Sequence, residues 1–138
     1  MNIREYQQKD LEQMLMIDGR SSQRRRDKLR LVECSPAFSC YVAEQNQKII
    51  GFIIMEDLGD GISYYMAQIN VAEKRKGIGR QLVKKVFSNL GPGTHISLCV
   101  NTDNETAIQF YESLGFQRSG FTEGYRKNQN KFWYQIDL

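Results

Sequence analysis

A basic segment with two glycines reads Lys74-Arg75-Lys76-Gly77-Ile78-Gly79-Arg80. It lies between an apolar, β-branched run at 62–71 and an amphipathic stretch that follows Gly77. The glycines allow a tight turn because no Cβ stands in the way. The helix that follows begins with unpaired N–H groups at the positive end of its dipole. Together with the surrounding basic side chains, this turn predicts a binding site for a phosphate or pyrophosphate group.

The composition indicates an ordinary globular protein. The 138 residues are 41% hydrophobic and 25% charged, which fits a single domain over residues 1–138. The net charge of +3 is too small to indicate a nucleic-acid partner. No apolar run is long enough to span a membrane, and the segment after Met1 lacks the apolar centre of a secretory signal. We therefore expect a cytoplasmic protein without a membrane partner.

The potential metal ligands are few. The three cysteines, Cys34, Cys40 and Cys99, have no metal-like spacing, and the only histidine is His95. We predict free thiols in a reducing compartment and no metal site.

Hydrophobic periodicity predicts alternating helices and strands. Helical spacing covers 9–17, 23–32, 78–90 and 104–114, with Gly19 and Ser21-Ser22 separating the first two helices. Strand-like runs cover 3–6, 39–43, 49–55, 62–71, 96–100, 116–121 and 131–136. The helical crossover between 62–71 and 96–100 predicts a parallel pair, whereas the hairpins predict antiparallel pairs. The expected fold is therefore mixed α/β: a central, mostly antiparallel sheet with one parallel βαβ pair and helices on both faces.

A second motif reads Asn104-Glu105-Thr106-Ala107-Ile108-Gln109-Phe110-Tyr111-Glu112-Ser113-Leu114-Gly115-Phe116. With the basic turn and the element order, it resembles the GNAT acetyltransferase superfamily over nearly the whole chain. The turn resembles that family's motif A, Gln/Arg-x-x-Gly-x-Gly/Ala, with Lys74 in place of the usual Gln or Arg. The second stretch resembles motif B, Asn-x-x-Ala-x-x-x-Tyr-x-x-x-Gly-Phe.

The resemblance implies a transferase that moves an acetyl group from acetyl-CoA to a primary amine. The amine would belong to a small-molecule or peptide acceptor and would attack directly, without an acetyl-enzyme. The resemblance places the pantetheine arm along the segment Ala67-Gln68-Ile69, with Gln68 and Ile69 as cofactor contacts and an N–H group near Ile69 stabilising the oxyanion. It adds Asn104 as a further cofactor contact. It places the pyrophosphate on the turn formed by Lys74, Arg75, Lys76, Gly77, Ile78, Gly79 and Arg80.

The resemblance also assigns a proton donor for the leaving thiolate, Tyr111. Asn104 and Tyr111 are two helical turns apart and share a helix face, so a plain core role for Tyr111 is the alternative. The general base is less well defined, since Cys99 occupies the position at which some relatives carry a glutamate. Glu56, Asp57, Glu73 or an ordered water remain candidates for the base, and a route through an acetylated Cys99 is a weaker alternative.

Several features have two interpretations. The run Arg24-Arg25-Arg26 predicts either a solvated helix face or a cationic rim that selects an acidic acceptor. One of Tyr64 and Tyr65 should lie in the core and the other in the acceptor pocket, while Phe132 and Trp133 are expected in the core. A non-catalytic CoA-binding module and a basic nucleic-acid-binding protein are the competing functions. Monomer and homodimer remain equally open.

Overall fold

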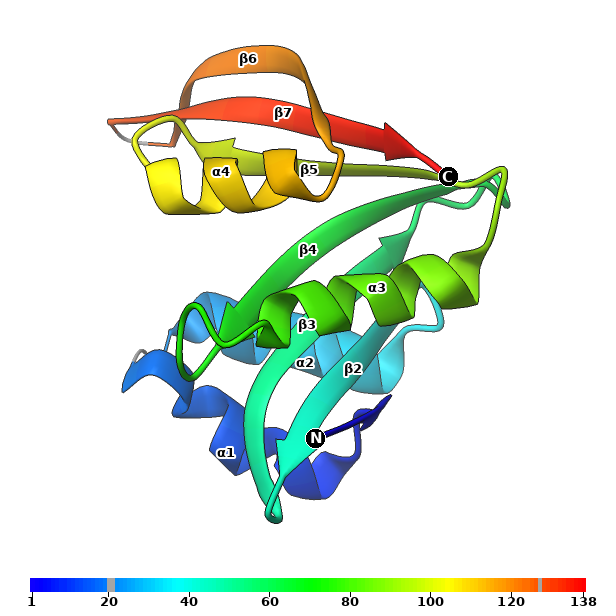
Figure 1. Cartoon of the computed structure of the whole chain (residues 1–138), viewed down its shortest axis with the longest axis vertical. Coiled ribbons are helices and arrows are strands. Elements are labelled where there is room, and N and C mark those ends of the chain that lie inside the picture. The colour runs from blue at the N-terminus through cyan, green and yellow to red at the C-terminus, as the bar shows by residue number, and fades with distance from the viewer. Residues whose placement is uncertain (20–21, 127) are drawn as a thin grey trace.

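The computed structural model describes residues 1–19, 22–126 and 128–138, which form one seven-stranded sheet flanked by helices (Figure 1). The strand order is β1-β2-β3-β4-β5-β7-β6. The strands are β1 (Asn2–Glu5), β2 (Phe38–Gln45), β3 (Lys48–Asp57), β4 (Ser63–Val71), β5 (His95–Asn101), β6 (Gln117–Arg126) and β7 (Gln129–Asp137). The α-helices are α1 (Leu11–Leu15), α2 (Gln23–Cys34), α3 (Ile78–Leu90) and α4 (Glu105–Ser113).

The predicted fold class and element order are confirmed. Every strand pair within the described residues is antiparallel except β4 with β5. The expected continuous helix from Lys9 to Ile17 is wrong, because only α1 is α-helical and 3-10 turns flank it at Gln8–Asp10 and Ile17–Gly19. Asp10 accepts a hydrogen bond from the Gln7 N–H, and this contact tightens the chain before α1.

The break before α2 is confirmed in part. Gly19 ends the second 3-10 turn, and the Ser22 hydroxyl caps α2 by accepting from the Arg25 N–H. Ser21 lies outside the described residues. Over residues 1–19, 22–126 and 128–138, no helix has both the length and the apolar character needed to cross a membrane.

Two buried clusters cover the two faces of the sheet. Under α3, the apolar stripe of Ile78, Leu82, Val83 and Val86 packs on side chains from β3, β4 and β5. The opposite face packs against α1 and α2 through Met14, Leu15 and Leu29. Gly51 allows α3 to lie close to β3, since a Cβ there would come within 2.9 Å of the Ile78 side chain. This close packing fixes the N-terminal end of α3 beside β4.

The sheet opens between β4 and β5. The two strands pair over only three positions, Ser63–Tyr65 with His95–Ser97, although β4 continues to Val71 and β5 to Asn101. On its other side, β4 carries a bulge at Ala67, since Ile54 pairs with Gln68 and Met55 with Met66. The edge of β4 from Met66 to Val71 that faces β5 therefore has no strand partner within the described residues.

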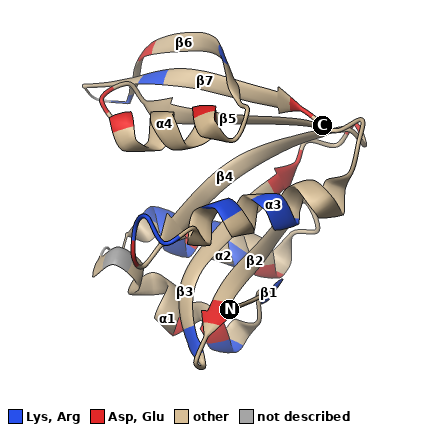
Figure 2. Cartoon of the chain, viewed as in Figure 1, with Lys and Arg blue, Asp and Glu red and all other residues tan. Residues whose placement is uncertain are grey.

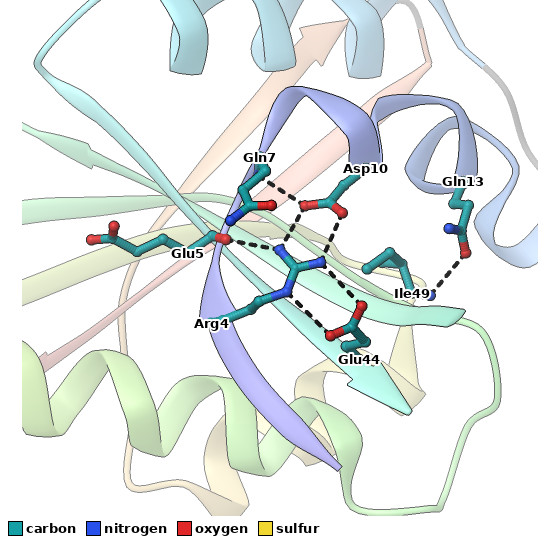
Figure 3. Close-up of polar contacts among 7 residues, drawn as sticks. All are labelled: Arg4, Glu5, Gln7, Asp10, Gln13, Glu44 and Ile49. Carbon is teal, nitrogen blue, oxygen red and sulfur yellow. Dashed lines mark hydrogen bonds and ion pairs between the residues drawn. The ribbon is translucent and has the colours of Figure 1, made fainter. Parts of the chain in front are cut away.

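A polar network ties the N-terminal strand to the rest of the sheet (Figure 3). Arg4 on β1 donates to both carboxylate oxygens of Asp10, at 2.9 and 2.8 Å, and more weakly to Glu44 on β2 at 3.3 Å. Burial alone would raise the pKa of the Asp10 carboxyl, but the bonds from Arg4 and the Gln7 N–H outweigh it and hold that pKa below its usual range. These contacts join β1 to the turn before α1 and to β2.

Candidate active site

An open groove of about 720 Å³ lies where α3, α4 and the unpaired edge of β4 meet. It brings together nine of the residues predicted for the site: Ile69, Lys74, Arg75, Gly77, Ile78, Gly79, Arg80, Asn104 and Tyr111. Gln68 and Lys76 were also predicted, but neither lines the groove. Figure 2 shows that the loop entering α3 at the groove is strongly basic.

The turn before α3 exposes backbone N–H groups. Arg75 and Gly77 both have left-handed backbones, with φ of +66° and +77°, and Gly77 is the N-cap of α3. The first intrahelical bond runs from Gln81 N to Gly77 O, so the N–H groups of Ile78, Gly79 and Arg80 have no acceptor inside the helix. Gly77, as the N-cap, has no side chain that could cap this end. Such a turn is a concave donor surface that suits an anion.

Gly79 sets the width of the groove. A Cβ at this position would lie 3.2 Å from Cζ of Phe110 and 3.8 Å from Cδ1 of Ile69. Arg80 crosses from α3 to α4, where its guanidinium donates to the Ser113 hydroxyl at 2.8 Å. The two helices are thereby held at a separation that a larger side chain at position 79 would disturb.

The edge of β4 forms another wall of the groove through Ile69, Asn70 and Val71. The Gln68 side chain is directed to Asn70, with Nε2 donating to Oδ1 at 2.7 Å. The Gln68 side chain is therefore engaged with its neighbour on β4, and Gln68 itself stays outside the groove lining. An extended ligand with amide groups can hydrogen-bond such an edge as an added strand would.

Tyr111 lies in the groove between two aromatic rings. Its ring centroid is 5.4 Å from that of Phe110 and 5.9 Å from that of Phe116. Its hydroxyl has no hydrogen-bond partner within the described residues, and burial raises the pKa of Tyr111 to about 12. The phenol therefore keeps its proton at neutral pH. Tyr111 both packs against aromatic rings and lines the groove, so a core role and a role in the site are compatible.

Asn104 has a structural role that its motif did not reveal. Its Oδ1 caps α4 by accepting from the Ala107 N–H at 3.2 Å. Its amide nitrogen and the second lone pair of Oδ1 are then available to a ligand in the groove.

The three candidate carboxylates lie in different places. Glu73 lines the groove beside the basic turn. Asp57 accepts from the Gly59 N–H in a turn. Glu56 pairs with Tyr65 across β3 and β4, so it stands on the sheet face away from α3.

The two adjacent tyrosines of β4 separate as predicted. Tyr64 packs against the cluster under α3. Tyr65 lies on the opposite face, and its hydroxyl is 3.2 Å from the Cys99 sulfur. Burial, aided by this contact, raises the pKa of the Tyr65 phenol well above its usual value.

Of the two aromatic residues expected in the core, Phe132 is half-buried and packs against the cluster under α3. The prediction for Trp133 is wrong, because its ring packs beside Tyr65 and Tyr125 at centroid distances of 6.3 and 6.4 Å, on the face away from α3. Adjacent residues of a strand face opposite sides of the sheet, so Trp133 lies on the face of its partner Cys99 while Phe132 lies on the other face.

The basic run of α2 divides into inward and outward side chains. Arg25 is only 3% exposed, and its guanidinium donates to the carbonyls of Met14 and Ile17 at 3.1 and 3.0 Å. Neither interpretation of the Arg24-Arg25-Arg26 run therefore holds for Arg25, which is a structural residue. Arg24 and Arg26 are exposed.

Cys34, Cys40 and Cys99 are free. Within the described ranges, no group of three His, Cys, Asp or Glu side chains is placed to hold a metal ion.

Comparison with known protein families identifies the family to which the chain belongs. The family model for the acetyltransferase (GNAT) domain matches residues 36–118, which include β4, the basic turn, α3 and α4. The chain belongs to the GNAT acetyltransferase family. The GNAT assignment made from the two motifs is thereby confirmed.

Individual GNAT relatives are distant. N-alpha-acetyltransferase RimI of Mycobacterium tuberculosis is 37% identical over 57 residues, which is 41% of this chain and 35% of that protein. The chain spans well under half the length of the curated relatives it matches.

Two solved structures superpose over nearly the whole chain. The ribosomal-protein-S18-alanine N-acetyltransferase from Escherichia coli has a TM-score of 0.80 at 20% identity, covering 99% of this chain and 92% of that one. An aminoglycoside 6′-N-acetyltransferase complexed with coenzyme A has a TM-score of 0.81 at 16% identity, covering 99% and 97%. At these identities the superpositions establish the shared fold only.

Proposed function

We propose that this GNAT protein is an acetyl-CoA-dependent N-acetyltransferase that acts on a primary amine by direct attack. One observation carries the proposal: a single groove joins the N–H groups at the start of α3, the unpaired edge of β4 and the Tyr111 phenol. A structural neighbour, the aminoglycoside 6′-N-acetyltransferase, was solved with coenzyme A, which supports the choice of cosubstrate.

The residues of the groove fit the parts of acetyl-CoA. The N–H groups of Ile78, Gly79 and Arg80 would hold the pyrophosphate, with Lys74 and Arg75 supplying positive charge. The backbone of Gln68 and Ile69 would pair with the pantetheine amides. The cosubstrate supplies the acetyl thioester and its leaving thiolate.

The chain's own groups would manage charge and protons during transfer. As the amine nitrogen bonds to the carbonyl carbon, a backbone N–H near Ile69 would stabilise the negative charge that develops on the carbonyl oxygen. The C–S bond then breaks, and the Tyr111 O–H protonates the sulfur. The proton lost by the amine would pass to water or to a carboxylate, of which Glu73 lines the groove and Glu56 lies on the sheet face away from α3. Cys99 contacts the Tyr65 hydroxyl at 3.2 Å, and direct attack by the amine requires no acetyl-enzyme at this thiol.

A Tyr111→Phe variant should lower kcat at least tenfold, because it removes the proton donor and keeps the ring packing. The affinity for acetyl-CoA should stay within a factor of two. In the wild type, the loss of the donor by ionisation should appear only as the pH approaches about 12. Steady-state kinetics of thiol release, combined with calorimetric binding, provide the measurement. An unchanged kcat would remove Tyr111 from the mechanism.

The proposed function is tested by the consumption of acetyl-CoA with a panel of amines, in parallel with calorimetric titration of acetyl-CoA. Binding followed by turnover of at least one amine is the expected result. Binding without turnover of any amine would indicate instead a non-catalytic CoA-binding module, the alternative that the undefined base keeps open.

A further inference from the structure

The sheet face away from α3 carries a set of cations around the opening between β4 and β5. Alternate residues of paired strands share a face, which places Tyr65, Cys99, Trp133 and Lys131 together. Helix α2 covers the same face, and its Lys28 reaches the bulge of β4. These groups lie on the side of the sheet opposite the groove under α3.

Two lysines from different parts of the fold are withdrawn from solvent there. Lys28 is half-buried, and its ammonium donates to the Ala67 carbonyl at 2.8 Å. Lys131 is only 9% exposed, and its ammonium lies 5.7 Å from the centre of the Tyr125 ring. Among the residues that the structure describes, no carboxylate lies within 4.0 Å of either ammonium.

Further cations surround this pair. Burial lowers the pKa of Lys28, and repulsion from Arg24, Arg126 and Lys131 adds to the effect. Burial also lowers the pKa of Lys131, where repulsion from Arg24 and Arg126 opposes attraction by Cys99 and the exposed Asp103. Partly buried cations that repel one another cost stability unless an anion joins them. Because the cluster draws on both α2 and the β6–β7 hairpin, an anion at this point would bridge the two arms of the opened sheet.

Neutral groups on this face have unused acceptors. Two buried side-chain oxygens have no hydrogen-bond partner within the described residues: Oδ1 of Asn101 and Oε1 of Gln68. Asn101 pairs with Lys131 across β5 and β7. Gln68 pairs with Ile54, which belongs to the buried cluster under α1 and α2. Amide oxygens of this kind accept from N–H donors. The face therefore offers positive charge to an anion and acceptors to an amine.

We propose that this face binds the acceptor and that Lys28 and Lys131 select an amine that carries a carboxylate, as in an acidic amino acid or a peptide with acidic first residues. This inference rests on the proposed acetyl transfer. Polycationic amines, such as polyamines and aminoglycosides, should be rejected, because the cluster repels them.

A binding experiment tests the site without any turnover. The chain has one tryptophan, Trp133, which stands beside Tyr65 in the proposed site, so its fluorescence reports occupancy. Titration with glutarate should give a saturable change that weakens with added salt, whereas the neutral glutaramide should give none. Lys131→Gln and Lys28→Gln should each weaken glutarate binding at least tenfold, and Lys131→Arg should retain it. Lys84→Gln, which removes an exposed lysine of α3, is the matched control and should bind as the wild type does.

The outcomes separate this inference from the proposed function. Equal responses to glutarate and glutaramide, or glutarate binding that is indifferent to both lysines, would overturn the inference. So would acetylation of spermidine as fast as that of glutamate or an acidic peptide, although the N-acetyltransferase function would then stand. Glutarate binding at Lys131 in a protein that acetylates no amine would leave the anion site in place and remove the proposed function. Comparison of glutamate with the acidic peptide distinguishes the two sources of the carboxylate.

Discussion

Gly79→Leu should weaken acetyl-CoA binding at least 100-fold. Even the Cβ of the new side chain would stand 3.2 Å from Phe110, which is tighter than an ordinary contact. The rest of the leucine must enter the groove between α3 and α4, next to N–H groups that we assign to the pyrophosphate. The leucine would remove the pyrophosphate contact and exclude the pantetheine arm. A 100-fold loss of affinity corresponds to about 2.7 kcal/mol of binding free energy.

The experiment needs a control for the leucine itself. Gln81→Leu places the same side chain two residues further along α3, at an exposed position outside the groove, and should bind acetyl-CoA normally. Gly79→Ala should fall between the wild type and Gly79→Leu, because Phe110 must move by only a few tenths of an ångström. Calorimetry gives the affinities, and circular dichroism confirms the fold. Wild-type affinity in a folded Gly79→Leu protein would contradict the assignment of the groove.

Arg4→Met should destabilise the protein by about 3 kcal/mol, because it leaves a buried carboxylate without its cation. Asp10 is 2% exposed and receives two bonds from Arg4 (Figure 3). Denaturant unfolding at neutral pH measures the free energy of unfolding. Arg30→Met removes an exposed arginine of α2 and should change that free energy by less than about 0.5 kcal/mol. Arg4→Met combined with Asp10→Asn should recover part of the loss.

The stability loss in Arg4→Met should depend on pH in a defined direction. The folded pKa of Asp10 is lowered, so its contribution to stability is present above the unfolded value of about 3.9 and is lost as the pH falls through the folded pKa. In Arg4→Met, the buried and unpaired carboxyl should have a raised pKa and gain stability as it protonates. The difference between wild type and variant should therefore shrink on acidification toward pH 4. A difference that stays constant between pH 7 and pH 4 would show that Asp10 is not the cause.

The sequence predicted the elements whose signals are local. The apolar stripe of α3 and the glycines of its entry turn are consecutive in the chain, and helical period with turn chemistry was enough to locate them. Asn104 and Tyr111 were assigned from the resemblance to motif B, and their spacing on one helix predicted that they share a face. The parallel pair of β4 and β5 followed from the helical crossover that connects them.

The features that the sequence could not predict depend on contacts between distant segments. The Lys9–Ile17 stretch has a helical pattern, but Arg4 and Gln7 hold Asp10 in a tighter turn before α1. The environment of Lys131 depends on the register of β7 against β5 and on the position of α2. The sequence alone indicates a surface charge at Arg25, because its contact with the Met14 carbonyl forms only when α2 packs against the preceding segment. These three features depend on tertiary contacts, which leave no local pattern in the sequence.

Calorimetric titration of the folded wild-type chain with acetyl-CoA tests the central claim most directly. We expect one molecule bound per chain, with clearly weaker binding of acetyl-phosphopantetheine, which lacks the pyrophosphate that the start of α3 is assigned to hold. Absence of heat on titration, or equal affinity for the two ligands, would contradict the account.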